Sequence, residues 1–273
     1  MTTFLKTFGA RTERIKTSIK VGENMSFKLG LVSISFRNHS PEEILKAMKD
    51  CGLNHIEWGS DVHAPCNDID NLKNIVKLQE KYGITCSSYG TYFRFGEKDT
   101  KELYQYAEAA KILGTNIIRL WCGNKNSQDY SEAEKAVLFE QCKEAAKIGE
   151  ELGVIFCMEC HNNTYTNTKE SAFELMQKVD SKHFRMYWQP NQYRTNEENI
   201  LSAKLLKDYT YHLHVFNWEG DNKYPLAEST EIWRKYLANF EGNALLLEFM
   251  PDNDIESLKV EASALKEIVK EAK

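Results

Sequence analysis

The chain has 273 residues, with 35 Lys and Arg against 40 Asp and Glu, which gives a formal net charge of −5. Hydrophobic residues make up 42% and charged residues 27%, a composition that excludes a disordered, collagenous or wholly coiled-coil chain. The acidic balance disfavours nucleic acid as the main partner, because duplex-binding domains carry a basic surplus. No apolar run approaches the roughly 20 residues that a membrane span requires, so we expect no membrane partner.

The N-terminal residues 1–24 differ from the rest, with five basic and two acidic residues and no clear period. Their composition is compatible with a targeting peptide, but we favour a flexible N-terminal extension and place the catalytic domain at 25–273. The seven cysteines are odd in number and scattered, without a secretory apolar segment before them. We therefore interpret them as reduced thiols of a cytoplasmic protein.

From Met25 onward, short apolar runs alternate with longer segments of helical period. The runs typical of buried strands are 27–35, 55–59, 84–90, 116–123, 154–159, 184–189, 211–216 and 244–249. Helices are predicted over roughly 41–52, 69–82, 99–113, 131–152, 169–179, 196–207, 230–239 and 254–271. Ser40 is a good N-cap before Pro41, and glycines that suit left-handed caps end several helices.

Eight successive strand–helix units predict a parallel sheet with crossover helices, and eight units of this length close into a single (β/α)8 TIM barrel. The rival is an open doubly wound sheet. That fold is typically marked by a Gly-rich phosphate-binding turn after its first strand. Here the corresponding turn is Ser35-Phe36-Arg37-Asn38-His39, which favours the barrel.

Polar residues end several of the predicted strands, where a barrel collects its catalytic groups. Glu159, His214 and Glu248 end three apolar runs that share one barrel mouth, and this arrangement suggests that a cation is their common partner. For Glu57 the sequence leaves two roles open, a catalytic role and a buried ion pair with Arg119. His212 is expected to be a hydrogen-bonded residue deeper in the barrel.

Side chains two residues apart in a strand share a face, so Cys157 and Glu159 point the same way. If Glu159 faces the barrel interior, Met158 and Cys160 face the helices. The two sulfurs of Cys157 and Cys160 then lie on opposite faces. This disfavours a redox or zinc-binding Cys-X-X-Cys pair, and we interpret both cysteines as packing residues.

With these residues in order, the chain resembles the xylose isomerase-like TIM barrels, the superfamily of sugar phosphate isomerases and epimerases that also includes endonuclease IV. The resemblance covers 27–270. It is carried by His55-Ile-Glu-Trp-Gly59 with Asp61 and His63, Tyr89-Gly90, Ile118-Arg-Leu-Trp121, Glu159-Cys-His161 with Thr164 and Thr166, Trp188-Gln-Pro190, His212-Leu-His214-Val215 and Leu247-Glu248.

The resemblance implies a divalent metal ion (Mn, Mg, Co or Zn) held by Glu159, Gln189, His214 and Glu248. Gln189 stands where the family commonly has aspartate, and Gln192 stands where a histidine often follows. A glutamine carbonyl can ligate a hard cation but brings no charge. We therefore expect weaker metal binding than in a relative that keeps the aspartate.

The expected reaction is proton transfer at a carbon next to a sugar carbonyl, as in an isomerase or epimerase of a sugar or sugar phosphate. Glu159 and Glu248 would remove and return the proton across the bound substrate. The residues expected to contact or enclose the substrate are His63, His161, Trp121, Tyr89 and Asn191.

Other functions remain open. A lyase or dehydratase of a polyol or keto acid would use the same carboxylates, and a non-catalytic sugar-binding barrel would fit the missing aspartate. A DNA-repair endonuclease is disfavoured, because it needs more metal ligands than Gln189 and Gln192 leave. The expected partner is a small-molecule sugar rather than nucleic acid or a membrane, and the chain is a possible homodimer.

Overall fold

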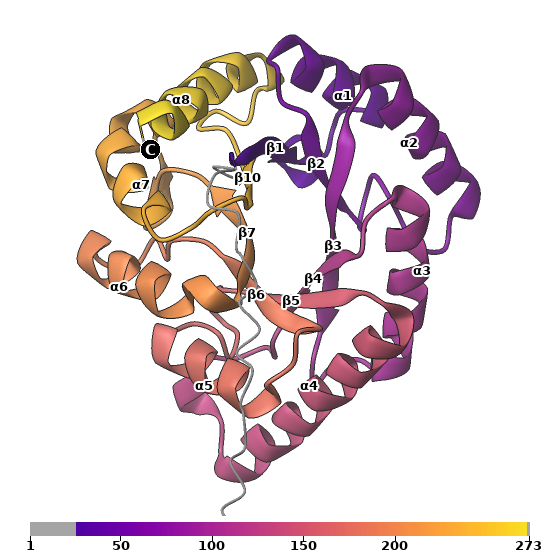
Figure 1. Cartoon of the computed structure of the whole chain (residues 1–273), viewed down its shortest axis with the longest axis vertical. Coiled ribbons are helices and arrows are strands. Elements are labelled where there is room, and N and C mark those ends of the chain that lie inside the picture. Colours follow the sequence, from indigo (N-terminus) through magenta and orange to yellow (C-terminus); the bar gives the residue numbers. More distant parts are fainter. Residues whose placement is uncertain (1–25, 272–273) are drawn as a thin grey trace, which may run out of the picture.

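The computed structural model describes residues 26–271, which form one closed barrel of eight parallel strands in the order β1-β10-β7-β6-β5-β4-β3-β2. In Figure 1 the helices follow one another around this barrel in chain order. The predicted single (β/α)8 TIM barrel is therefore confirmed. The expected extension at 1–24 lies outside the described residues.

The barrel strands are β1 (Lys28–Val32), β2 (His55–Gly59), β3 (Thr85–Arg94), β4 (Ile117–Trp121), β5 (Ile155–Glu159), β6 (Phe184–Trp188), β7 (Thr210–Val215) and β10 (Ala244–Leu247). The helices are α1 (Pro41–Asp50), α2 (Ile69–Tyr82), α3 (Leu103–Leu113), α4 (Glu132–Leu152), α5 (Lys169–Val179), α6 (Asn196–Leu206), α7 (Thr230–Leu237) and α8 (Leu258–Glu271). The strands β8 (Trp218–Glu219) and β9 (Asn222–Lys223) form a separate small hairpin.

Local sequence signals explain where the helices begin and end. Ser40 and Glu43 form a reciprocal capping box at the start of α1, with Pro41 at the first helical position. The same box recurs at Ser131 before α4. Gly83 ends α2 in the left-handed conformation, which glycine adopts easily because it has no Cβ atom. These caps are why most predicted helix ends agree with the structure to within two residues.

The apolar residues form two layers, one inside the barrel and one between the strands and the helices. Cys157 belongs to the inner layer with Val32, Tyr187 and Leu246. Met158 belongs to the outer layer, and Cys160 packs against it. The predicted opposite orientation of the two cysteines is confirmed, and all seven cysteines are unpaired thiols.

Several strands differ in length from the predicted runs, and in β1 and β3 serines and a register shift accompany the difference. β1 stops at Val32, and Ser33–Phe36 form a 3-10 turn. In that turn Ser33 Oγ accepts a hydrogen bond from the Gly59 amide, and Ser35 Oγ accepts one from the Phe249 amide. β3 is longer than predicted and runs on to Arg94, with an irregular register against β4 beyond Gly90.

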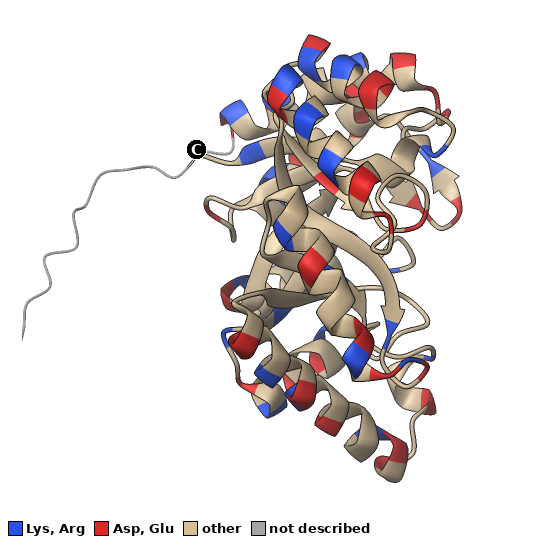
Figure 2. Cartoon of the chain, turned by 90° about the vertical axis from the view of Figure 1, so that its right-hand side faces the viewer, with Lys and Arg blue, Asp and Glu red and all other residues tan. Residues whose placement is uncertain are grey.

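Positions of Lys and Arg and of Asp and Glu are interspersed over the outer helices and loops, and the strands between them carry few (Figure 2). Within residues 26–271, no helix is long and apolar enough to cross a membrane.

His212 lies on β7 inside the barrel, where its Nδ1 accepts a hydrogen bond from the Ala244 amide, as expected for a satisfied interior histidine. Burial lowers the pKa of His212 from 6.5 to about 4. The unfolded chain therefore binds a proton between these values that the folded chain does not, so stability falls as pH falls through this window.

We expect His212→Asn, which retains an acceptor for the Ala244 amide, to remove this pH dependence. Between pH 7.5 and 5.0 the parent protein should lose about 2 kcal/mol more unfolding free energy than the variant, measured by urea denaturation. Equal losses would mean that His212 titrates normally in the folded protein.

Candidate active site

Three ionisable side chains from different strands meet at the C-terminal mouth of the barrel. Glu159 ends β5, His214 lies near the end of β7 and Glu248 follows β10 directly. His214 Nδ1 lies 3.5 Å from Glu159 Oε1 and 3.4 Å from Glu248 Oε2. One ligand atom from each of these residues lies within 4.8 Å of the other two. The structure therefore brings together the three residues that the sequence singles out.

Gln189, which follows β6, completes this group. Its Oε1 lies 3.0 Å from the same His214 Nδ1. Neighbouring ligand atoms around a tetrahedral metal ion with bonds of about 2.1 Å are spaced about 3.4 Å apart. Two carboxylates, an imidazole nitrogen and an amide oxygen at this spacing fit a divalent cation, and we call Glu159, Gln189, His214 and Glu248 the mouth cluster.

A buried ion pair lies beneath the mouth cluster. Arg119 on β4 donates from Nε to Glu57 Oε1 at 2.8 Å, and Glu57 Oε2 lies 3.4 Å from His214 Nε2. Burial opposes the charge on Glu57, but Arg119 and His214 outweigh it and hold its pKa at about 2. Glu57 thus orients the His214 ring so that Nδ1 faces the cluster. Of the two roles left open for Glu57, the buried pair with Arg119 is the one observed.

Glu159 is engaged by donors on both of its oxygens. Its Oε2 accepts hydrogen bonds from Arg119 Nη1 at 2.6 Å and from Trp121 Nε1, while Oε1 faces His214. The Trp121 ring is in turn stacked between the Arg94 guanidinium, 3.7 Å from its centroid, and the His161 ring at 4.8 Å. Burial would raise the pKa of Glu159, but Arg119 and His214 outweigh burial and hold it far below its ordinary value.

Glu248 has a different environment. Burial raises its pKa above the ordinary value; the charge of Glu159 adds to this, and His214 opposes it. In the metal-free state, burial disfavours the charge on His214, but Glu248 and Glu57 outweigh burial and raise its pKa to about 10. The next residue, Phe249, has a φ of 53°, which is unusual for a bulky side chain and marks strain beside the site.

A pocket of about 240 Å³ opens above the mouth cluster. This volume is smaller than the clefts of roughly 300–1,000 Å³ that hold drug-sized ligands, so it suits a small molecule. It is lined by Ile34, Arg37, Tyr92, Arg119, Trp121, Glu159, His161, Gln189, Gln192, Phe216, Trp218, Glu248 and Phe249.

Of the predicted substrate contacts, Trp121 and His161 line this pocket and the other three do not. His63 is buried, with Nδ1 3.1 Å from Ser33 Oγ and Nε2 3.1 Å from the His39 carbonyl, so both nitrogens are already used. Tyr89 is fully buried and donates to the Ala64 carbonyl at 2.6 Å. These two residues therefore support the loop after β2 instead of contacting substrate.

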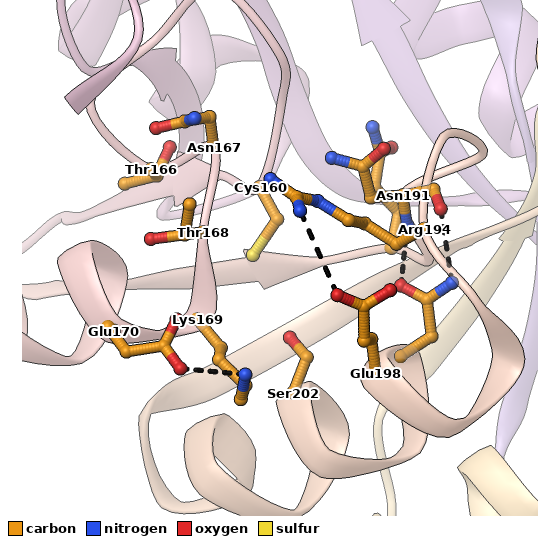
Figure 3. Close-up of a pocket in the computed structure, with 12 residues that line it drawn as sticks. Cys160, Thr166, Asn167, Thr168, Lys169, Glu170, Asn191, Arg194, Glu198 and Ser202 are labelled. Carbon is orange, nitrogen blue, oxygen red and sulfur yellow. Dashed lines mark hydrogen bonds and ion pairs between the residues drawn. The ribbon is translucent and has the colours of Figure 1, made fainter. Parts of the chain in front are cut away.

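Asn191 lies in a second, smaller pocket of about 80 Å³, between the loops that lead into α5 and α6 (Figure 3). Its Nδ2 donates to Asn162 Oδ1 at 2.7 Å. The predicted contact of Asn191 with substrate is therefore not supported. Conversely, Tyr92 and Phe249 line the main pocket without having been predicted. The outward direction of Tyr89 follows from the alternation of side chains along β3. Its neighbours Ser88 and Gly90 pair with Glu57 and Arg119, which face the barrel interior.

A model of the family described as xylose isomerase-like TIM barrel matches residues 45–270. The chain belongs to this family. A 3-dehydroshikimate dehydratase of Bacillus anthracis is 25% identical over 207 residues, covering 70% of this chain and 71% of that protein.

Solved structures of family members share the fold. The probable 3-DHS dehydratase involved in petrobactin synthesis in B. anthracis has a TM-score of 0.76 at 20% identity, over 88% of this chain and 99% of that one. A Mycobacterium smegmatis family member in complex with magnesium gives 0.70 at 13%, over 92% and 99%. The IOLI protein with a bound zinc atom gives 0.70 at 17%, over 90% and 99%.

Gln189 provides a test of the metal site. Replacing it by glutamate adds a charged ligand at the same position, and metal affinity rises with the number of charged ligands. We expect Gln189→Glu to bind Mn²⁺ at least about ten-fold more tightly than the parent protein, measured by calorimetry with a competing chelator. Asn191→Asp, which adds the same charge two residues away and outside the cluster, is the control. An equal gain in both variants would indicate a general charge effect instead of ligation.

Proposed function

We propose that this protein is a metal-dependent lyase that removes water from a small hydroxylated keto acid of the 3-dehydroshikimate type. The observation that carries the proposal is the asymmetry of the two mouth carboxylates. Both oxygens of Glu159 are engaged, by Arg119 and Trp121 on one side and His214 on the other. Glu248 contacts one charged neighbour, His214. A single free carboxylate suits a one-base elimination.

In this scheme Glu248 removes the proton from the carbon next to the substrate carbonyl. The C–O bond one carbon further breaks as the C=C bond forms, and the same carboxyl returns the proton to the departing hydroxyl, so that water leaves. A divalent cation in the mouth cluster would supply charge stabilisation at the carbonyl oxygen. Glu159, Gln189 and His214 would hold it, and Glu248, the fourth member of the mouth cluster, would be left to act as the base. Trp121 and Phe249 would exclude solvent from the reacting carbons.

The named relative supports this choice, since the 3-dehydroshikimate dehydratase of B. anthracis matches over 70% of this chain. Isomerisation or epimerisation of a sugar, the reaction first expected from the sequence, is the rival within the same site. A two-base epimerisation would require Glu159 to leave Arg119 and Trp121 in order to carry a proton. The pocket of about 240 Å³ favours a small-molecule substrate over nucleic acid.

The test is to incubate the protein with Mn²⁺ and 3-dehydroshikimate and to follow the ultraviolet absorbance of the aromatic product, 3,4-dihydroxybenzoate. Parallel incubations in D₂O with ketohexoses and their phosphates report proton exchange by NMR. We expect dehydration of the acid, lost on treatment with chelator. Deuterium incorporation into a ketose, without dehydration of the acid, would establish the rival reaction instead.

A further inference from the structure

Two arginines line the main pocket, and only one of them has capacity left for a ligand. Arg119 is 2% exposed and binds both Glu57 and Glu159. Its charge is therefore used within the barrel. Arg37, in the loop between β1 and α1, keeps 38% of its side chain exposed. An incoming anion therefore meets a more accessible guanidinium at Arg37, which pairs with one carboxylate, than at Arg119, which pairs with two.

Arg37 is held in place from behind. Its Nε donates to Asp61 Oδ2 at 2.9 Å, Nη1 donates to the Ile34 carbonyl at 3.2 Å, and Nη2 donates to the Tyr92 hydroxyl. A guanidinium has five N–H groups, so these contacts leave two of them free. Asp61 itself does not line the pocket. The group is thus fixed in orientation while part of its donor fork remains open, which is what bidentate recognition of a carboxylate needs.

The wall beside Arg37 offers donors and positive charge. The Phe249 ring lies 6.0 Å from the Arg37 guanidinium carbon and 4.9 Å from Lys223 Nζ on the β8–β9 hairpin. Trp218, which lines the same pocket, has a buried indole N–H without a hydrogen-bond partner in the described part of the chain. This wall therefore calls for a ligand group that accepts hydrogen bonds and carries negative charge.

We infer that Arg37 anchors a carboxylate of the substrate. The ring of the substrate would lie between the aromatic walls, and the carbonyl of the substrate would be directed to the mouth cluster. The inference rests on the proposed function and narrows it, because it selects an acid over a neutral sugar. One fork-shaped donor and a pocket of about 240 Å³ suit a planar carboxylate better than a phosphate, which is typically bound by several donors.

The pocket of Figure 3 is another cavity that basic residues line. There Lys169 pairs with Glu170 at 2.7 Å, and Arg194 lies 3.8 Å from Glu198. Both glutamates, which are the carboxylate neighbours of these two cations, line that pocket, whereas Asp61, the partner of Arg37, does not line the main pocket. Arg194 is therefore a suitable control position, being a cation on the same face with its own carboxylate neighbour.

The experiment compares shikimate with its methyl ester, which has the same ring but no charge. Binding is measured by calorimetry on the Mn²⁺-supplemented protein, for the parent chain and for Arg37→Gln, Arg37→Lys and Arg194→Gln. We expect the parent protein to bind shikimate at least about ten-fold more tightly than the ester. Arg37→Gln should abolish the difference and Arg37→Lys should retain part of it, while Arg194→Gln should behave like the parent protein.

Equal binding of acid and ester by the parent protein, undetectable binding of both, or an unchanged preference in Arg37→Gln would overturn the inference. A second ligand pair, fructose 6-phosphate and fructose, tests the phosphate alternative: a larger Arg37-dependent preference in that pair would overturn the carboxylate assignment. Thermal unfolding midpoints within a few degrees of the parent value identify variants that remain folded.

The inference and the proposed function fail in different ways. An Arg37-dependent preference for the acid, without dehydration of 3-dehydroshikimate, would contradict the lyase assignment and support the role of Arg37 in binding a carboxylate. Dehydration with an unchanged KM in Arg37→Gln would support the lyase assignment and contradict the role of Arg37 in binding a carboxylate.

Discussion

Glu248→Gln should lower the turnover of 3-dehydroshikimate by about a thousand-fold, because the amide cannot accept the proton that the reaction removes. Within residues 26–271, Glu248 is the mouth carboxylate without an arginine partner, whereas Glu159 is held by Arg119. The measurement is steady-state dehydration with saturating Mn²⁺. Glu241→Gln, an exposed position shortly before β10, is the control and should be unchanged.

The comparison with Glu159→Gln tests the asymmetry itself. Glu159 is a proposed metal ligand and a partner of Arg119. Loss of its carboxylate should chiefly weaken Mn²⁺ binding, and added metal should restore part of the activity. Glu248→Gln should not recover with metal. Turnover above a tenth of the parent value in Glu248→Gln, or identical metal rescue of both variants, would contradict the one-base scheme.

Arg119→Met should reduce the unfolding free energy of the metal-free protein by about 3–5 kcal/mol, because it leaves two buried carboxylates without their shared counter-charge. Arg119 is 2% exposed and binds Glu57 at 2.8 Å and Glu159 at 2.6 Å. Urea denaturation with a chelator present measures the loss. The deficit should shrink as pH falls, since the pKa of Glu57, held at about 2 by Arg119 and His214, rises when Arg119 is removed.

Two further variants test whether the loss of stability in Arg119→Met comes from the unpaired carboxylate charges. Adding Glu57→Gln to Arg119→Met removes one of the stranded carboxylates and should recover part of the stability. Arg194→Met removes an exposed arginine, 45% accessible, and should cost less than about 0.5 kcal/mol. A loss below about 1 kcal/mol in Arg119→Met would show that the interior tolerates the unpaired carboxylates.

The fold could be predicted from sequence because its signals are local. Strand β2 and helix α2 have their predicted bounds, since apolar runs, the Asp68 cap and Gly83 mark them directly. The strand-borne groups Glu159, His214 and Glu248 also follow from the sequence, because a parallel barrel places strand ends at one mouth. The geometry of Gln189 follows in the same way, since it comes directly after Trp188 at the end of β6.

Residues whose positions depend on irregular strand pairing or on loops could not be predicted in the same way. Between Gly90 and Arg94, β3 advances four residues while its partner β4 advances two, from Arg119 to Trp121. This irregularity brings Tyr92 into the pocket wall, and no periodic pattern encodes it. His63 likewise follows β2 as the sequence suggests, but its two hydrogen bonds, to Ser33 and His39, depend on how separate loops meet.

The origins of the pocket residues divide by role. The charged groups Arg119, Glu159 and His214 project from strands, whereas Arg37 and Trp218 belong to segments that follow strands and contribute none of the buried ion pairs. Loops accept insertions and substitutions far more readily than barrel strands. Under the proposed function, substrate range can therefore change separately from the buried ion pairs. Exchanging the segments that carry Arg37 and Trp218 is a practical route to other acids, as long as Glu248, which follows β10, is retained.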